Sequence, residues 1–116
     1  MNFFELRGQT LTKLDIDIDD VRIETLSAKY LLTHQQDCCE SVTVVKVEGD
    51  PVSILNSPII LAEEDSDEIP NWEHYYDSSH TWTSFRLVAE NGKEVKFWFL
   101  GQSNGYYSES VDFCKI

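Results

Sequence analysis

Alternation of apolar and polar residues is the strongest pattern along this chain. In residues 14–18 leucine or isoleucine alternates with aspartate, and in residues 21–25 mostly β-branched side chains alternate with charged ones. A period of two is typical of a strand with one buried face. Asp19 and Asp20 stand between the two runs, where aspartate favours a tight turn. The pattern therefore predicts two antiparallel strands near the N-terminus.

Other segments are rich in β-branched and aromatic side chains, which pack well on a pleated sheet. They predict strands at residues 29–33, 42–47, 59–62, 81–89, 95–100 and 106–113. Asn91 and Gly92 lie between two of these segments and tolerate the positive φ that a type I′ hairpin turn requires. Five apolar side chains of this hairpin are expected on its buried face: Phe85, Leu87, Val95, Phe97 and Phe99. Trp82 and Trp98 then lie on the opposite face.

One short helix is expected after Gly49. Asp50 can cap it by accepting a backbone N–H, and Pro51 suits its first position. No internal repeat or domain boundary interrupts the chain. We therefore expect residues 1–116 to form a single α+β domain, mostly β, with one curved antiparallel sheet or partial barrel and one or two short helices.

Charge limits the classes of partner. Acidic residues outnumber basic ones, 21 to nine, which gives a formal net charge of −12. No lysine or arginine lies between Lys46 and Arg86, and nine acidic residues fall in that window. A field of this sign repels nucleic acid phosphates and attracts basic surfaces. Direct nucleic-acid binding is therefore disfavoured, and a basic protein is the expected partner.

Three features bear on the compartment. No stretch reaches the roughly 18 apolar residues of a transmembrane helix, and the N-terminus lacks the regions of a secretion signal. Three cysteines leave one unpaired under any intramolecular scheme, so reduced thiols fit better than a disulfide framework. A bridge from Cys38 or Cys39 to Cys114 stays open. We expect a cytoplasmic protein that does not associate with membranes.

Residues 34–40, His-Gln-Gln-Asp-Cys-Cys-Glu, concentrate reactive groups at a junction between strands. One interpretation is a zinc site. Its ligands would be His34, Cys38 and Cys39, completed by Asp37, His74, His80 or Cys114. Against this, ligand cysteines are usually about two to four residues apart, and adjacent residues of an extended segment point to opposite sides. A structural turn is therefore the favoured interpretation, and no cofactor is expected.

A further interpretation of the same segment is nucleophilic catalysis, with Cys38 or Cys39 as nucleophile and His34 as base. A reactive thiol needs a lowered pKa, whereas neighbouring carboxylates, here Asp37 and Glu40, raise the pKa of a thiol. A metal-binding or hydrolytic domain that uses residues 34–39 is therefore the alternative function. The primary expectation is a protein without enzymatic activity.

The acidic segment at residues 63–68 is expected to be a loop that contacts a partner. Its carboxylates can take the place of phosphates in a basic groove, although most charge runs are only solvated surface. The aromatic cluster that follows offers rigid contact area or, alternatively, a second small core. The expected contact residues are Glu63, Glu64, Asp65, Asp67, Glu68, Trp72, Tyr75 and Tyr76.

Three motifs, in this order, resemble a family of small acidic proteins encoded by bacteriophages and mobile elements. They are residues 34–40, the Asn-Ser-Pro-Ile step at 56–59 with Leu-Ala-Glu-Glu at 61–64, and the tail at 103–113. The resemblance covers residues 10–113 and transfers no catalytic residue, because no activity is established for that family. The motifs also suggest that the turns at 37–40 and 104–107 pack against each other.

The resemblance implies a phage setting, in which small acidic accessory proteins often bind and block host proteins. Combined with the charge, it leads to one expected function. The chain is expected to be a non-enzymatic acidic interaction protein that binds a basic host or phage protein. Nucleic-acid mimicry would let it inhibit a host protein such as a defence nuclease or a CRISPR effector.

Overall fold

The computed structural model of the chain describes residues 2–36, 39–66, 79–103 and 108–116, and every structural statement below concerns these residues. The described part is mostly β, with two short 3-10 helices, which confirms the expected fold class. The strands divide into two antiparallel sheets, where one curved sheet was expected. Its helices are single turns, far shorter than any segment that could traverse a bilayer.

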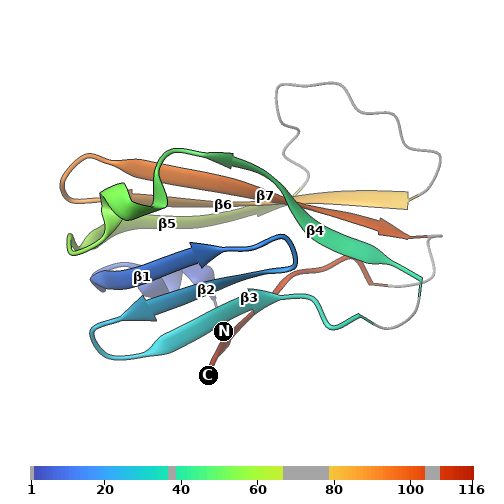
Figure 1. Cartoon of the computed structure of the whole chain (residues 1–116), viewed down its shortest axis with the longest axis horizontal. Coiled ribbons are helices and arrows are strands. Elements are labelled where there is room, and N and C mark those ends of the chain that lie inside the picture. Colours follow the sequence, from blue (N-terminus) through green and yellow to red (C-terminus); the bar gives the residue numbers. More distant parts are fainter. Residues whose placement is uncertain (1, 37–38, 67–78, 104–107) are drawn as a thin grey trace.

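Each sheet contains four strands, and the two sheets lie one above the other in Figure 1. The first sheet has the order β1-β2-β3-β8, with β1 at Leu11–Ile16, β2 at Asp20–Thr25, β3 at Lys29–Thr33 and β8 at Asp112–Lys115. The second has the order β4-β7-β6-β5, with β4 at Ser41–Glu48, β5 at Ile59–Ser66, β6 at Ser79–Ala89 and β7 at Glu94–Ser103. The helix η1 at Phe3–Leu6 precedes β1, and η2 at Pro51–Ile54 connects β4 to β5.

An aromatic core joins the inner faces of the two sheets. Phe85, Phe97 and Phe99 of the second sheet are fully buried, and Phe113 of the first sheet is nearly so. Phe3 of η1 lies between them, with its ring centroid 4.9 Å from that of Phe85 and 5.5 Å from that of Phe113. Because either sheet alone would expose an apolar face to water, this contact holds the two sheets together.

The hairpin expected around Asn91 and Gly92 is present as β6 and β7. Ala89 donates its N–H to the carbonyl of Lys93 at 2.9 Å, and Gly92 donates to the carbonyl of Ala89 at 3.0 Å. Only Gly92 of these turn residues has a positive φ, 84°. The turn is therefore not of type I′, which needs a positive φ at two consecutive residues.

The side chains of this hairpin lie on the inner and outer faces that the alternation predicted. Trp82 and Trp98 lie on the outer face, where they form a second buried cluster with Leu100. The ammonium groups of Lys46 and Lys96 lie 5.2 and 4.9 Å from the centroid of the Trp98 ring, within the range of cation–π attraction. The outer face of the second sheet therefore has an aromatic centre of its own.

The cap expected for the short helix is also present, because the Asp50 carboxylate accepts the N–H of Val52 at 3.0 Å. Two boundaries differ from the sequence expectation. Residues 63–66 belong to strand β5 rather than to a loop, and the last strand begins at Asp112 rather than near residue 106. Both differences arise where pairing with a distant strand, and not local composition, decides the backbone conformation.

The aromatic core predicts a large loss of stability when one ring is removed. We expect Phe85→Ala to lower the free energy of unfolding by about 3–5 kcal/mol, because Phe85 is fully buried and contacts the rings of Phe3 and Phe97. Urea unfolding measures this value. Val52→Ala, at a side chain that is 69% exposed, is the control and should change it by less than about 0.5 kcal/mol. Equal losses in the two variants would contradict this assignment of the core.

Candidate functional site

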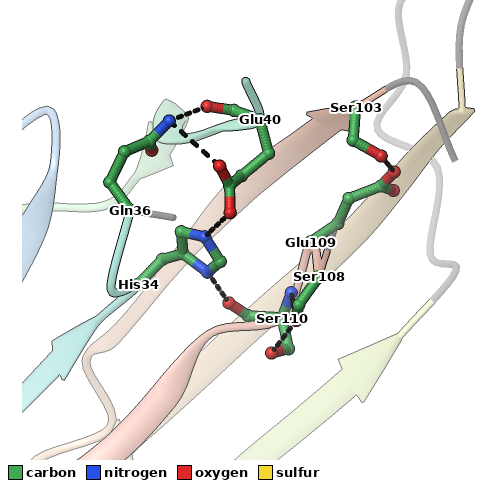
Figure 2. Close-up of polar contacts among 7 residues, drawn as sticks. All are labelled: His34, Gln36, Glu40, Ser103, Ser108, Glu109 and Ser110. Carbon is green, nitrogen blue, oxygen red and sulfur yellow. Dashed lines mark hydrogen bonds and ion pairs between the residues drawn. The ribbon is translucent and has the colours of Figure 1, made fainter. Parts of the chain in front are cut away.

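A polar cluster occupies one end of the sandwich, where the chain passes between the sheets. His34 follows β3 and Glu40 precedes β4, while Ser103 ends β7 and Glu109 lies just before β8. Figure 2 shows these side chains converging from the two connections. Segments that are far apart in the sequence thus meet at this end because both crossings between the sheets run through it.

His34 joins the two connections through both of its ring nitrogens. Nδ1 lies 2.7 Å from the carbonyl oxygen of Ser110, and Nε2 lies 3.1 Å from a carboxylate oxygen of Glu40. A carbonyl can only accept, so Nδ1 must carry a proton. One further proton must then lie between Nε2 and Glu40, either on the imidazole as an ion pair or on the carboxyl group. The His34–Glu40 contact is therefore a shared-proton pair, drawn as dashed lines in Figure 2.

The Glu40 carboxylate is the most buried part of this cluster. Its side chain is fully buried, and that of His34 is 5% exposed. Gln36 donates its amide N–H to a carboxylate oxygen of Glu40 at 3.2 Å and also to the Glu40 backbone carbonyl. Charges buried in this way are tolerated only when they are hydrogen-bonded or paired. The segment around Glu40 is thus held by its own polar contacts.

A second buried carboxylate, that of Glu109, lies against the inner face of β6 and β7. Thr81 donates its hydroxyl to one Glu109 oxygen at 2.8 Å, and Ser103 donates to the other at 2.5 Å. Gly101 makes this approach possible, since a Cβ at that position would lie 2.6 Å from both the Cβ and the carbonyl oxygen of Glu109. The residues before β8 therefore close the end of the core with a hydrogen-bonded carboxylate.

Two cavities flank this cluster, and Ser108 lines both. One, of about 310 Å³, is lined by His34, Gln35, Gln36, Glu40 and Ser108. The other, of about 280 Å³, is lined by Glu64, Ser66, Thr81, Thr83, Ser108, Glu109, Ser110 and Val111. Both linings include glutamate and serine side chains, and neither contains a lysine or an arginine. The site is therefore suited to a cationic group rather than to an anion.

Glu64 shows the electrostatic consequence of lining such a cavity. The residue lies on an exposed strand, yet part of its carboxyl group faces the cavity wall. This partial burial raises the pKa of Glu64 above its ordinary value of 4.5, because desolvation disfavours the charged form. The carboxylate at this position is thus held in a less solvated setting than an ordinary surface glutamate.

The geometry does not favour hydrolytic or metal chemistry at His34. Both ring nitrogens already face protein oxygens, so neither is available to activate a serine or a thiol, or to ligate a metal, without losing a contact. Cys39 is in a disulfide, which corrects the expectation of a reduced thiol there, whereas Cys114 is free. Among the described residues no three His, Cys, Asp or Glu side chains gather as metal ligands.

The structure separates the expected site residues. Glu63, Glu64 and Asp65 lie on β5, His34 belongs to the polar cluster, and Cys39 directly precedes Glu40 of that cluster in the sequence. Asp67, Glu68, Trp72, Tyr75 and Tyr76, with Asp37, Cys38 and His74, fall outside the described residues. The turns at 37–40 and 104–107 lie largely outside as well, but their neighbours His34 and Ser110 are in contact.

Sequence reasoning missed the partners of Glu109. Thr81 was assigned only to a strand and Ser103 only to the tail motif, since nothing local marks either hydroxyl as a donor to Glu109, which is 28 positions from Thr81. One signal was present, because Gly101 interrupts a strand that is otherwise aromatic and apolar. A glycine inside a strand marks a close approach by another part of the chain.

Comparison with known proteins places these residues within one family region. A family model described as a domain of unknown function, DUF7448, matches residues 5–113. No curated protein matches the chain, and no solved structure does. The match spans both sheets and the whole polar cluster, so the cluster belongs to the region that the family model describes.

The shared-proton pair predicts a double-mutant result. We expect His34→Ala to lower the free energy of unfolding by about 3–5 kcal/mol, because it leaves Glu40 buried without the imidazole. Adding Glu40→Gln should recover part of this loss, since a neutral amide costs less to bury. Urea unfolding of the two single variants and the double variant measures the coupling, with Val52→Ala as an exposed control. Purely additive losses would show that the two side chains do not act as a pair.

Glu64 predicts a pH-dependent gain in stability. Because its pKa is raised on folding, the ionised group opposes folding at neutral pH, and this cost disappears as the pH falls below the raised pKa. Glu64→Gln should therefore stabilise the protein at neutral pH and have little effect near pH 3. Thermal unfolding at the two pH values tests this. Glu90→Gln, at the opposite end, controls for the change in net charge. If it raised the stability at neutral pH as much as Glu64→Gln does, burial of Glu64 would not be the cause.

Proposed function

The chain belongs to the DUF7448 family, a domain of unknown function, and we propose that it is a non-enzymatic protein that binds a basic partner protein. Binding is proposed to occur at the acidic end, which is the end of the sandwich that holds the polar cluster. Its carboxylates are those of Asp17, Asp19, Asp20, Glu64, Asp65 and Asp112. The observation that carries the proposal is the segregation of charge along the strands.

The pairing register places these carboxylates at the same end of the two sheets. In the first sheet Thr33 pairs with Asp20 on one side and with Asp112 on the other, so the acidic turn after β1 and the start of β8 share one end. In the second sheet β5 reaches the same end with Glu64 and Asp65. All six residues are exposed except Asp20, which is half-buried.

All lysines and arginines lie elsewhere in the structure. Those at the opposite end are Arg7, Lys13, Lys29, Lys93 and Lys115, and those further in along the strands are Arg22, Lys46, Arg86 and Lys96. Several of these basic residues form ion pairs. Lys13 and Lys29, for example, pair with Glu24 at 3.7 and 3.8 Å. Among the described residues, no lysine or arginine forms an ion pair with the six carboxylates of the acidic end, and a field of this sign attracts a basic surface.

Within the expected contact set, Glu63 differs from its neighbours. Arg86 lies 3.9 Å from Glu63 and 2.5 Å from Glu94. Hydrogen bonding to the same guanidinium lowers the pKa of Glu94 below its ordinary value. Glu63 is therefore partly neutralised from within the protein. Glu64 and Asp65 are the members of the set on β5 that remain for a partner.

We further propose that the partner is a nucleic-acid-binding host protein, such as a defence nuclease or a CRISPR effector, and that the chain is phage-encoded and acts in the host cytoplasm. A groove built for phosphates accepts carboxylates, and occupation of that groove would inhibit the partner. The net charge of −12 and the resemblance of the three motifs to phage proteins support this proposal.

Reversing charge at the acidic end should remove partner binding without unfolding the protein. The wild-type chain should capture a partner from host extract. The variant Asp19→Lys with Asp65→Lys should not capture it, since both residues are exposed and belong to that end. Mass spectrometry identifies the partner, and titration of the purified pair at rising salt should show affinity falling with ionic strength.

The matched control is Glu48→Lys with Glu90→Lys, which changes the net charge by the same amount away from the acidic end. This variant should still capture the partner. Equal capture by both double variants would show that the acidic end is not the binding surface.

A further inference from the structure

Strand β5 forms the outer edge of the second sheet. β6 pairs with one side of it. On the other side, the backbone hydrogen bonds made by the described residues lie at its start, where Gly8 and Gln9 bond Ile59 at 2.7 and 2.8 Å. Within the described part of the chain, no strand pairs with that side from Glu63 to Ser66. A strand edge of this kind offers unpaired N–H and C=O groups to another chain.

The side chains along this edge select which chain can pair with it. Glu63, Glu64 and Asp65 are consecutive and exposed. A second copy of β5 would place carboxylates beside carboxylates, and like charges on neighbouring strands destabilise pairing. A strand with lysine or arginine at these positions would instead bring opposite charges together. The edge therefore opposes self-association and favours a basic segment.

The cavity beside Glu64 gives this edge a specific acceptor for one basic side chain. Glu64 and Ser66 lie on the same face of β5, and both line the 280 Å³ cavity that also contains the Glu109 carboxylate and several hydroxyl groups. In an added strand, side chains opposite Glu64 would lie on this face. The head group of a lysine or arginine there would reach oxygen acceptors from two sides.

From the free edge, its charge and the cavity, we infer that the partner supplies an extended basic segment that adds as a strand to β5 at residues 63–66, with one lysine or arginine in the cavity beside Glu64. This inference rests on the proposed function and specifies how the partner is bound. Main-chain hydrogen bonds supply affinity in such a mode, and the cavity supplies specificity.

A peptide of alternating lysine and threonine tests this mode of binding, because threonine favours extended backbone and lysine supplies charge. The control is the same peptide with every backbone amide N-methylated, which keeps the charge but cannot donate a main-chain hydrogen bond. With the unmodified peptide, amide hydrogen exchange should slow within residues 60–66. We expect Glu64→Gln to weaken its binding about tenfold and Glu90→Gln to leave it unchanged, because only Glu64 lies beside the added strand.

Equal binding of the two peptides, or an absence of slowed exchange within residues 60–66, overturns strand addition. If both peptides bind equally and the variant Asp19→Lys with Asp65→Lys abolishes both, the acidic end still binds basic chains and only the strand mode fails. If neither peptide binds and that variant still captures the partner from extract, the proposed function fails as well.

Discussion

The contact between the inner faces of the two sheets is the constraint on which the rest of this structure depends. Phe3, Phe85 and Phe113 bring η1, the second sheet and the first sheet into one core. Once the sheets are stacked, the connections from β3 to β4 and from β7 to β8 must both cross at the same end. That end would admit water to the core unless polar groups closed it in a hydrogen-bonded arrangement. This end is closed by His34, Glu40 and Glu109. The polar cluster is therefore primarily a consequence of the packing of the two sheets.

Most of the strands could be predicted because one-face burial produces a period of two in the sequence. The turn between the first two strands, the hairpin around Gly92 and the outward position of the two tryptophans all follow from that alternation. The division into two sheets could not be predicted, since the alternation gives each strand a buried face without saying which other strand faces it. Residues 63–66 were expected to be a loop because they are polar, but an edge strand tolerates charge on both faces and pairs through its backbone.

Only part of the polar cluster could be predicted from the sequence, because its contacts join segments that are far apart in the chain. The segment at 34–40 drew attention by its composition, and His34 and Glu40 do form its central pair. The pair depends on the Ser110 carbonyl, 76 residues away, which accepts a hydrogen bond from Nδ1, while Glu40 contacts Nε2, so both ring nitrogens already have partners. Local chemistry therefore identified His34 and Glu40 but not their distant partner, and the thiols beside them suggested metal and nucleophile interpretations that were less favoured than a structural turn.

Stability alone does not explain where the charges lie. Surface ion pairs contribute little, about 0–1 kcal/mol each, so lysines could be placed among the exposed aspartates at almost no cost. The opposite end has such a mixture, with Glu24 between Lys13 and Lys29. At the acidic end, repulsion among like charges instead opposes folding, and burial at Glu64 adds a further cost. A segregation that costs stability, and in which these described carboxylates form no ion pair with a lysine or an arginine, supports the proposal that a partner supplies the opposite charge. Because the carboxylates of β5 also disfavour pairing of the strand with itself, the same residues would both protect the edge and, in the proposed binding mode, select a basic partner.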